Sequence, residues 1–159
     1  MNTCDVLVNA MKRYRDLIFI DQRSVKSPIL PVLKSVYIEV KHFHECGYPR
    51  HNDDESYTLN ITFVAKITSN TVWGALRALE TFSQLVHQKD STKELMINST
   101  HINDFPRYNF RAMHTDTARH FIPKKVIYAN LDAMAYNKFN VFHWHIIDDQ
   151  SFPFERFNV

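Results

Sequence analysis

The sequence has little net charge and no long apolar run. Its 159 residues carry 19 lysines and arginines against 17 acidic residues, which leaves a net charge of +2. There is no basic run with interleaved aromatic residues, the usual sign of a protein that binds nucleic acid. No segment approaches the roughly 18 uninterrupted apolar residues that a membrane span requires. We therefore expect neither a nucleic-acid partner nor a membrane span.

A secretory signal peptide is also missing from the start of the chain. The residues after Met1 are Asn2-Thr3-Cys4-Asp5, and they lead directly into an amphipathic segment. Either the protein is cytosolic, or its natural N-terminus lies upstream of Met1.

Cysteine is scarce, with only Cys4 and Cys46 in the chain. On count alone, two free thiols would be typical of a cytosolic protein. Two acceptor triplets for N-glycosylation, Asn60-Ile61-Thr62 and Asn98-Ser99-Thr100, are instead typical of a secreted protein. Taken by themselves, these residues leave both compartments open.

What the sequence does contain is enough apolar material for a core, with 45% hydrophobic and 13% aromatic residues. Hydrophobic periodicity in the first hundred residues predicts two helices and several strands that together form a small α+β domain. Thr3 is the expected N-cap of the first helix. The predicted helices are Asp5–Ile20 and Val72–His87, and the predicted strands are Val32–Val40, Tyr57–Val64 and Glu94–Asn98 with a following short segment, which would complete a small sheet. Ser69-Asn70-Thr71 offers cap residues for the second helix.

Tyr57–Val64 is the clearest of these strands. Its apolar residues Tyr57, Leu59, Ile61 and Phe63 share one face, which we expect to face the core, so Asn60 should point to the solvent face.

The pattern of the remaining residues predicts a βαβ unit, in which the two strands run parallel. A strand at Tyr108–Thr117 precedes a helix at Pro123–Tyr136, and a mostly apolar strand at Val141–Ile147 follows it. The helix is predicted to begin with Pro123 at its first position and to carry an apolar stripe of Val126, Ile127, Leu131 and Met134. Chemistry in parallel α/β folds collects at the carboxyl ends of the strands. The polar residues at these ends are Asp116, Arg119 and His120 after the first strand and Asp148 and Asp149 after the second.

Three chemistries are compatible with these strand ends. His143 and His145 lie on the same side of one strand, as in metal-dependent hydrolases. Arg119 with the acidic residues fits sugar or phosphate binding, because a guanidinium offers paired donors. Asp148-Asp149 offers a carboxylate for acid–base support. The structural alternative is that the two histidines pack in the core and Asp148-Asp149 caps the next turn.

Two parallel strands and one helix do not make a complete domain. They leave the sheet edges open, and a (β/α)8 barrel requires about 250 residues. We therefore expect the chain to be a fragment of a longer protein.

Longer motifs in the chain resemble one family closely. The resemblance is to the β-N-acetylhexosaminidases of glycoside hydrolase family 20, and in particular to the lysosomal β-hexosaminidase subunits of animals. The motifs that carry it are Asp104-Phe105-Pro106-Arg107, Asp116-Thr117-Ala118-Arg119-His120-Phe121-Ile122-Pro123, Met134-Ala135-Tyr136-Asn137-Lys138-Phe139-Asn140-Val141-Phe142-His143-Trp144-His145, Asp148-Asp149 and Ser151-Phe152-Pro153-Phe154-Glu155, with Thr71-Val72-Trp73-Gly74-Ala75-Leu76 upstream.

The resemblance implies an α+β domain over residues 1–104, followed over residues 105–159 by the first βαβ unit of a truncated (β/α)8 barrel. It also implies an exo-β-N-acetylhexosaminidase that removes terminal N-acetylglucosamine or N-acetylgalactosamine from glycoconjugates. In that retaining mechanism, the acetamido group of the substrate attacks the anomeric carbon, a Glu acts as the acid, and the preceding Asp orients the acetamido group. The mechanism needs no cofactor and no metal.

Site residues follow from matching positions. Arg119 corresponds to the arginine that hydrogen-bonds the hydroxyls of the terminal sugar. Asp148 corresponds to an aspartate that supports the catalytic acid through a histidine, which is also missing from this chain. The catalytic Asp-Glu pair of the family lies beyond Val159, so we expect this chain alone to be inactive. Ala112 stands where the family usually has Gly, and His114 is unusual in the first barrel strand.

The resemblance also implies covalent and cellular features. Cys4 and Cys46 correspond to a paired position, so we expect a disulfide between them. Asn98 matches an acceptor site of the family, whereas Asn60 is an acceptor without such a counterpart. We expect a lysosomal or secreted protein whose signal peptide is missing from this chain, and a homo- or heterodimer in the full-length form.

Two other classes of function stay open from the residues. One is a non-catalytic truncated form that binds a partner subunit or a glycan through its first domain. The other is a metal-dependent barrel hydrolase that uses His143 and His145.

Overall fold

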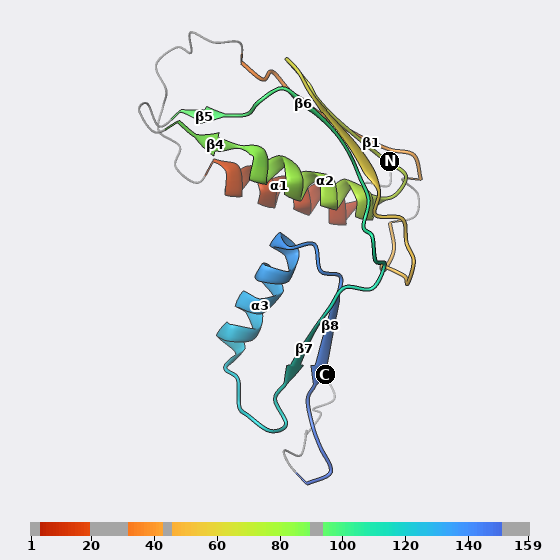
Figure 1. The fold of residues 1–159 in the computed structure, drawn as a ribbon, viewed down its shortest axis with the longest axis vertical. Coiled ribbons are helices and arrows are strands. Elements are labelled where there is room, and N and C mark those ends of the chain that lie inside the picture. The colour runs from red at the N-terminus through yellow and green to blue at the C-terminus, as the bar shows by residue number, and fades with distance from the viewer. Residues whose placement is uncertain (1–3, 20–31, 43–45, 90–93, 151–159) are drawn as a thin grey trace. The chain divides into compact units, whose positions relative to one another are not determined.

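The computed structural model describes residues 4–19, 32–42, 46–89 and 94–150 (Figure 1). The chain divides into two compact units, Met1–Asn109 and Phe110–Val159. The predicted domain boundary lies between residues 104 and 105, in the last part of the first unit. We describe each unit by itself.

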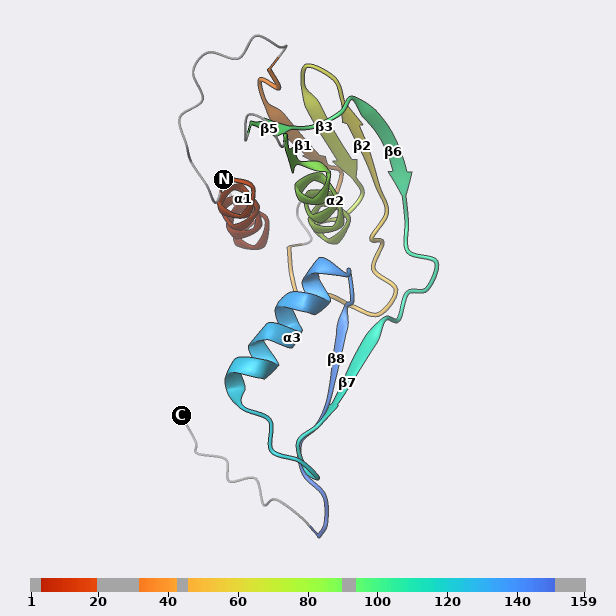
Figure 2. The ribbon, with the colours of Figure 1, turned by 60° about the vertical axis from the view of Figure 1, so that its left-hand side comes forward.

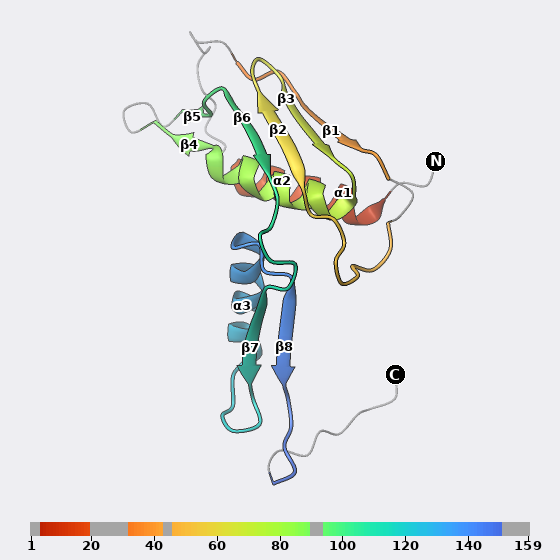
Figure 3. The same ribbon diagram turned by 45° about the vertical axis from the view of Figure 1, so that its right-hand side comes forward.

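The first unit is an α+β domain with a mixed four-stranded sheet in the order β1-β3-β2-β6. Strand β1 is parallel to β3, and the other pairs are antiparallel. Both helices lie on the same face of this sheet (Figures 2 and 3). The elements are α1 (Asp5–Ile18), α2 (Val72–Leu85), β1 (Val36–Val40), β2 (Tyr57–Ile61), β3 (Ala65–Ser69) and β6 (Thr100–Asp104).

The alternation of side chains along the strands determines which residues of this unit form the core. On β2 and β3 every second residue is buried, and the residues between them face the other side of the sheet. The buried strand residues pack with an apolar stripe of α2 and with the inner face of α1. The buried core residues are Leu7, Ala10, Tyr14, Tyr57, Leu59, Ile61, Ala65, Ile67, Val72, Ala75, Ala78, Leu79 and Phe82.

The sheet differs from the prediction in three places. Strand β1 begins at Val36 rather than at Val32. The strand predicted to reach Val64 ends at Ile61, where a turn starts in which the Thr62 amide donates to the Val64 carbonyl over 3.0 Å. Phe63, predicted to face the core, is therefore 66% exposed. The turn leads into β3, a strand that the apolar pattern of the sequence does not predict.

The segment after α2 also differs from its prediction, because only part of it joins the main sheet. Strands β4 (His87–Gln88) and β5 (Leu95–Met96) form a separate antiparallel ribbon. Only β6 joins the main sheet, where it pairs with β2. The prediction that this segment completes a small sheet is confirmed for β6 alone.

Helix α1 is fixed at both ends of its buried face. Its N-cap position is Cys4, which makes no side-chain cap, whereas the predicted cap Thr3 lies outside the described residues. Cys4 forms the predicted disulfide with Cys46, with their Cα atoms 5.7 Å apart. Toward its C-terminus, the Tyr14 hydroxyl donates to Oε2 of the buried Glu80 on α2 over 2.8 Å. Burial, together with this bond, raises the pKa of Tyr14 to about 12.

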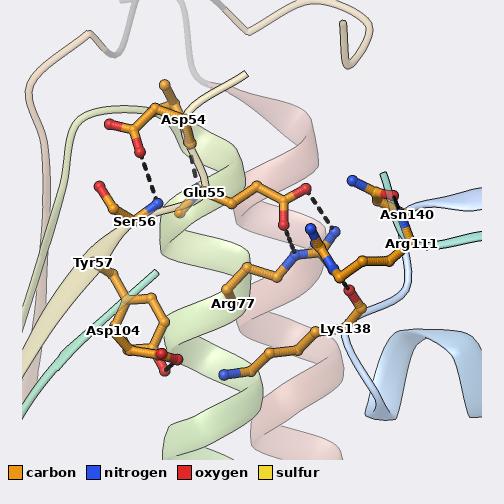
Figure 4. Close-up of polar contacts among 11 residues, drawn as sticks. Asp54, Glu55, Ser56, Tyr57, Arg77, Asp104, Arg111, Lys138 and Asn140 are labelled. Carbon is orange, nitrogen blue, oxygen red and sulfur yellow. Dashed lines mark hydrogen bonds and ion pairs between the residues drawn. The ribbon is translucent and has the colours of Figure 1, made fainter. Parts of the chain in front are cut away.

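Polar contacts fix the start of α2. Thr71, one of the three cap residues that the sequence offers, is the N-cap of α2. Its hydroxyl oxygen accepts from the Gly74 amide over 3.2 Å, and its hydroxyl donates to the Asp54 carbonyl. One turn later, Arg77 donates from Nε and Nη2 to the two carboxylate oxygens of Glu55, over 2.9 and 3.2 Å (Figure 4). This paired geometry satisfies a carboxylate that is only 8% exposed.

The second unit is a βαβ unit with parallel strands, as predicted. Strand β7 (Ala112–Asp116) pairs with β8 (Val141–His145) in a register that places Ala112 opposite Val141 and Asp116 opposite His145. Helix α3 (Lys124–Tyr136) connects them and lies beside the strand pair in all three views (Figures 1–3). Together with the first unit, this gives a small α+β protein with mixed and parallel sheets.

Helix α3 departs from its prediction in two details. Pro123 is the N-cap residue rather than the first helical residue. Of the predicted apolar stripe, Ile127 and Met134 are buried, whereas Val126 is 46% exposed and Leu131 is 40% exposed.

The end of α3 is a left-handed cap. Lys138 has a φ of 58°, the Phe139 amide donates to the Met134 carbonyl over 2.9 Å, and the Lys138 amide donates to the Ala135 carbonyl over 3.1 Å. Arg111 Nε then donates to the Lys138 carbonyl over 2.8 Å, which joins this cap to the residue before β7 (Figure 4).

No helix in the described ranges is both long and apolar enough to cross a membrane.

Replacing Gly74 by Ala should destabilise the first unit by about 1–3 kcal/mol, the usual cost of overpacking. A Cβ at residue 74 would collide with the Ser56 carbonyl oxygen and lie 3.0 Å from the Ser69 Cβ. Gly47→Ala is the matched control, because a Cβ there meets nothing within 4 Å. The free energy of unfolding from urea titrations is the measurement. Equal stability of the two variants would show that α2 and the sheet are not in this close contact.

Candidate functional site

The carboxyl ends of β7 and β8 meet at one edge of the second unit, and polar residues gather there. Asp116 is the last residue of β7 and lies opposite His145, the last residue of β8. Arg119 follows β7 in the loop to α3, and Asp148 follows β8. Parallel pairing brings these four residues together, because it places both strand ends at the same edge.

Asp116 holds the loop that carries Arg119. Its Oδ1 accepts from the backbone amides of Ala118 and Arg119, over 3.0 and 3.2 Å. Its Oδ2 accepts from Arg119 Nη1 over 2.5 Å. A single carboxylate therefore fixes both the backbone turn and the guanidinium of Arg119.

Asp148 contacts the same guanidinium from the other strand. Arg119 Nη2 lies 3.0 Å from Asp148 Oδ2, and His145 Nε2 lies 3.1 Å from Asp148 Oδ1. Both oxygens of Asp148 are thus occupied. The four side chains form one chain of contacts, in the order Asp116, Arg119, Asp148, His145.

Electrostatics keep this group charged. Hydrogen bonding from Arg119, more than the backbone bonds, lowers the pKa of Asp116 below its ordinary value. Hydrogen bonding to Asp116, followed by the charges of Asp116 and Asp148, raises the pKa of Arg119. Each ion therefore favours the ionised form of the other.

The group can present both donors and acceptors to a polar solute. The Arg119 side chain is 65% exposed, although two carboxylates hold it. A guanidinium held in this way keeps its orientation and offers its outward donors to oxygen atoms such as sugar hydroxyls. Because the carboxylates already fix the Arg119 side chain, this side chain would lose little further conformational entropy when a polar solute binds to it.

Three of the five polar residues predicted at these strand ends are thus brought together, Asp116, Arg119 and Asp148. His120 and Asp149 are exposed, and no hydrogen bond or ion pair to either is present within the described part of the chain. The contact of His145 with Asp148 was not predicted. Its signal in the sequence is the spacing of three residues across a strand end.

His143 and His145 lie on one face of β8, and His114 lies on the same face of β7. The ring centroids of His114 and His143 are 4.8 Å apart, and those of His114 and His145 are 6.3 Å apart. Among the described residues, no group of three or more His, Cys, Asp or Glu side chains is arranged to hold a metal ion. The metal-hydrolase alternative therefore has no ligand set in this part of the chain.

The two glycosylation acceptors are both exposed. Asn98 lies between β5 and β6, outside any strand, and Asn60 lies in β2. The predicted orientation of Asn60 toward the solvent face of the sheet is confirmed.

Comparisons with known families match two stretches of the chain. The family described as "Glycosyl hydrolase family 20, catalytic domain" matches residues 108–158. The family described as "beta-acetyl hexosaminidase like" matches residues 1–85. The candidate site lies within the first of these stretches.

Whole-chain relatives agree with these matches. Beta-hexosaminidase subunit beta of Felis catus is 46% identical over 96% of this chain and 30% of its own length. Beta-hexosaminidase subunit alpha of Rattus norvegicus is 46% identical over 97% of this chain and 30% of its own length. The chain thus spans about a third of the length of the curated relatives it matches.

Solved structures give the same result for the fold. The chitobiase of Flavobacterium johnsoniae superposes with a TM-score of 0.71 at 33% identity, over 91% of this chain and 22% of that chain. The exo beta-N-acetylglucosaminidase of Vibrio harveyi superposes with a TM-score of 0.66 at 27% identity, over 90% and 21%.

Replacing Arg119 by Gln should raise the pKa of Asp116 toward its ordinary value. The lowered pKa in the folded chain means that Asp116 contributes stability above its unfolded pKa, and that this contribution is lost as pH falls through the folded pKa. In Arg119→Gln the contribution should be smaller. Carboxyl ¹³C shifts followed against pH measure the change. Lys124→Gln on α3 is the control, and an equal shift of the Asp116 pKa in that variant would contradict the assignment.

Proposed function

Since this chain belongs to glycosyl hydrolase family 20, we propose that it provides part of the substrate site of an exo-β-N-acetylhexosaminidase. The enzyme would remove terminal N-acetylglucosamine or N-acetylgalactosamine from glycoconjugates. The observation that carries the proposal is the Arg119–Asp148 ion pair at 3.0 Å, which joins the carboxyl ends of two parallel strands.

In this proposal, β7, α3 and β8 are the first βαβ unit of a (β/α)8 barrel, and residues 105–159 are its beginning. Parallel pairing and the helical crossover support this, since barrels of this type place their active sites at the carboxyl ends of the strands. The two parallel strands described here leave the remaining strands of such a barrel to a longer polypeptide.

Arg119 would bind hydroxyls of the terminal sugar. A guanidinium that is held by Asp116 and Asp148 and remains 65% exposed suits that role, because it is oriented before the sugar arrives. Lys would keep the charge but lose the planar fork of donors.

Asp148 would act as a positioning residue that supports the catalytic acid through a histidine. That histidine, like the acid, would come from outside these residues. Within the chain, His145 contacts the other oxygen of this carboxylate over 3.1 Å and helps to hold it in place. The acid and the Asp before it would come from the fourth barrel strand. The reaction would retain configuration, with the substrate's acetamido oxygen as the nucleophile. No cofactor takes part in this scheme.

We also propose that the protein is lysosomal or secreted and forms a homo- or heterodimer at full length. The Cys4–Cys46 disulfide supports an oxidising compartment. The similarity to both alpha and beta subunits of beta-hexosaminidases supports a subunit-type enzyme.

Arg119→Lys should lower kcat/KM about ten- to hundredfold without loss of folding. A charge-assisted hydrogen bond contributes about 1.5–3 kcal/mol, and about 1.4 kcal/mol is tenfold. The measurement uses a chimera in which residues 1–159 replace the matching segment of the Felis catus subunit. Asp148→Asn in the same chimera should reduce kcat more than it changes KM.

The charge-preserving control is Lys125→Arg on the exposed side of α3, which should leave the kinetics unchanged. Wild-type kinetics for Arg119→Lys, in a chimera that is active and folded, would show that Arg119 does not bind the sugar.

Residues 1–159 alone should show no hexosaminidase activity. General acid catalysis contributes about 10²–10⁴-fold, and the proposed acid is not among these residues. The test is turnover of a chromogenic N-acetylglucosaminide at acidic pH, compared with a mock preparation. Turnover that Asp148→Asn abolishes would contradict the prediction. Binding of a GlcNAc-terminated oligosaccharide without turnover would favour the non-catalytic, glycan-binding alternative.

A further inference from the structure

One face of the four-stranded sheet in the first unit is covered by α1 and α2, and the other is polar. The register places four residues in one row across all four strands: Tyr37 opposite Lys66, Lys66 opposite Asn60, and Asn60 opposite His101. All four are exposed. Asn60 stands on β2, an inner strand, and so lies near the middle of this outer face.

The side chain of Asn60 is available for modification. Its neighbours in the chain, Leu59 and Ile61, are 0% and 1% exposed, because they point to the opposite face. Strand side chains stand roughly perpendicular to the sheet, so the Asn60 amide points into solvent. Within the described residues, the structure contains no hydrogen bond that occupies this amide.

The rest of the acceptor triplet is also accessible. Thr62 is exposed just after the end of β2, and its hydroxyl donates to the Val64 carbonyl over 3.2 Å. Asn60 and Thr62 thus belong to an extended segment that leads into a turn. A sugar linked to Asn60 displaces no buried group of the folded unit.

We propose that Asn60 carries an N-linked glycan that covers the outer face of this sheet. The neighbours suit a polyhydroxyl chain, since they include the Lys66–Glu39 ion pair at 2.8 Å and the polar side chains of Thr58 and Asn103. A bulky, hydrated glycan at the centre of this sheet face keeps the face exposed to solvent. Any subunit contact of the proposed dimer then uses another surface.

The proposal depends on the secretory route given under Proposed function, and the experiment separates the two. Residues 1–159 are expressed in animal cells behind a cleavable secretory leader, and the secreted chain is treated with peptide N-glycosidase in ¹⁸O water. This enzyme converts each glycosylated Asn to labelled Asp. Mass spectrometry should find the label at Asn60 in most chains and also at Asn98, together with the Cys4–Cys46 disulfide.

Variants identify the acceptor by gel mobility. Asn60→Gln and Thr62→Val should each remove one glycan, whereas Thr62→Ser should keep it, because serine also completes the triplet. Asn103→Gln is the matched control, since Asn103 is exposed on the same face but is followed by Asp104 and Phe105. If a variant is not secreted, the labelling of the unaltered chain decides.

An unlabelled Asn60, in secreted chain with the disulfide formed and Asn98 labelled, overturns the proposal and leaves the secretory route intact. Absence of both labels and of the disulfide overturns the route and, with it, the glycan at Asn60.

Discussion

The first unit depends on how closely helix α2 approaches the sheet. Residue 74 has no side chain, and the space that a Cβ would need is already filled by the Ser56 carbonyl and the Ser69 side chain. This approach lets the α2 stripe pack directly on the buried residues of β2 and β3. Helix α1 then packs on α2, fixed by the Tyr14–Glu80 bond and the Cys4–Cys46 disulfide. Small domains with short strands gain from such fixed contacts, because their core is small.

The second unit depends on a different constraint, the parallel pairing of β7 and β8. Antiparallel strands would place Asp116 and Asp148 at opposite edges. Parallel pairing places them at the same edge, where one guanidinium lies between two carboxylates. Isolated surface ion pairs contribute little stability, so this arrangement is better understood as orienting Arg119 than as holding the fold together.

The charges at this edge stabilise one another. The pKa of Asp116 is lowered by the hydrogen bond from Arg119, and the partner's pKa is raised in turn. Protonation of Asp116 would weaken its hold on both the Arg119 loop and the Arg119 guanidinium. Because the pKa of Asp116 is lowered, this protonation occurs at a lower pH than for an ordinary aspartate. Histidines are gathered on the adjoining strand face, where His114 meets His143 edge-on at 4.8 Å.

The sequence by itself determined that the helices form, that the βαβ unit forms and which residues lie at its strand ends. Apolar periodicity and the residues that begin or end an element are local properties, so they can be recognised without the tertiary structure. It also determined, through resemblance, the pairing of Cys4 with Cys46. Strand β3 was not predicted, because two of its three buried residues, Ala65 and Ser69, are small. They do not give the strand a recognisable alternation of large apolar and polar residues. Phe63 was assigned to the core because its period fits, whereas the turn at Thr62 exposes it. Only the tertiary structure decided that α2 approaches the sheet at Gly74, that Asp116 orients Arg119, and that His145 meets Asp148. Those contacts depend on register and on the meeting of distant strand ends, which no local pattern specifies.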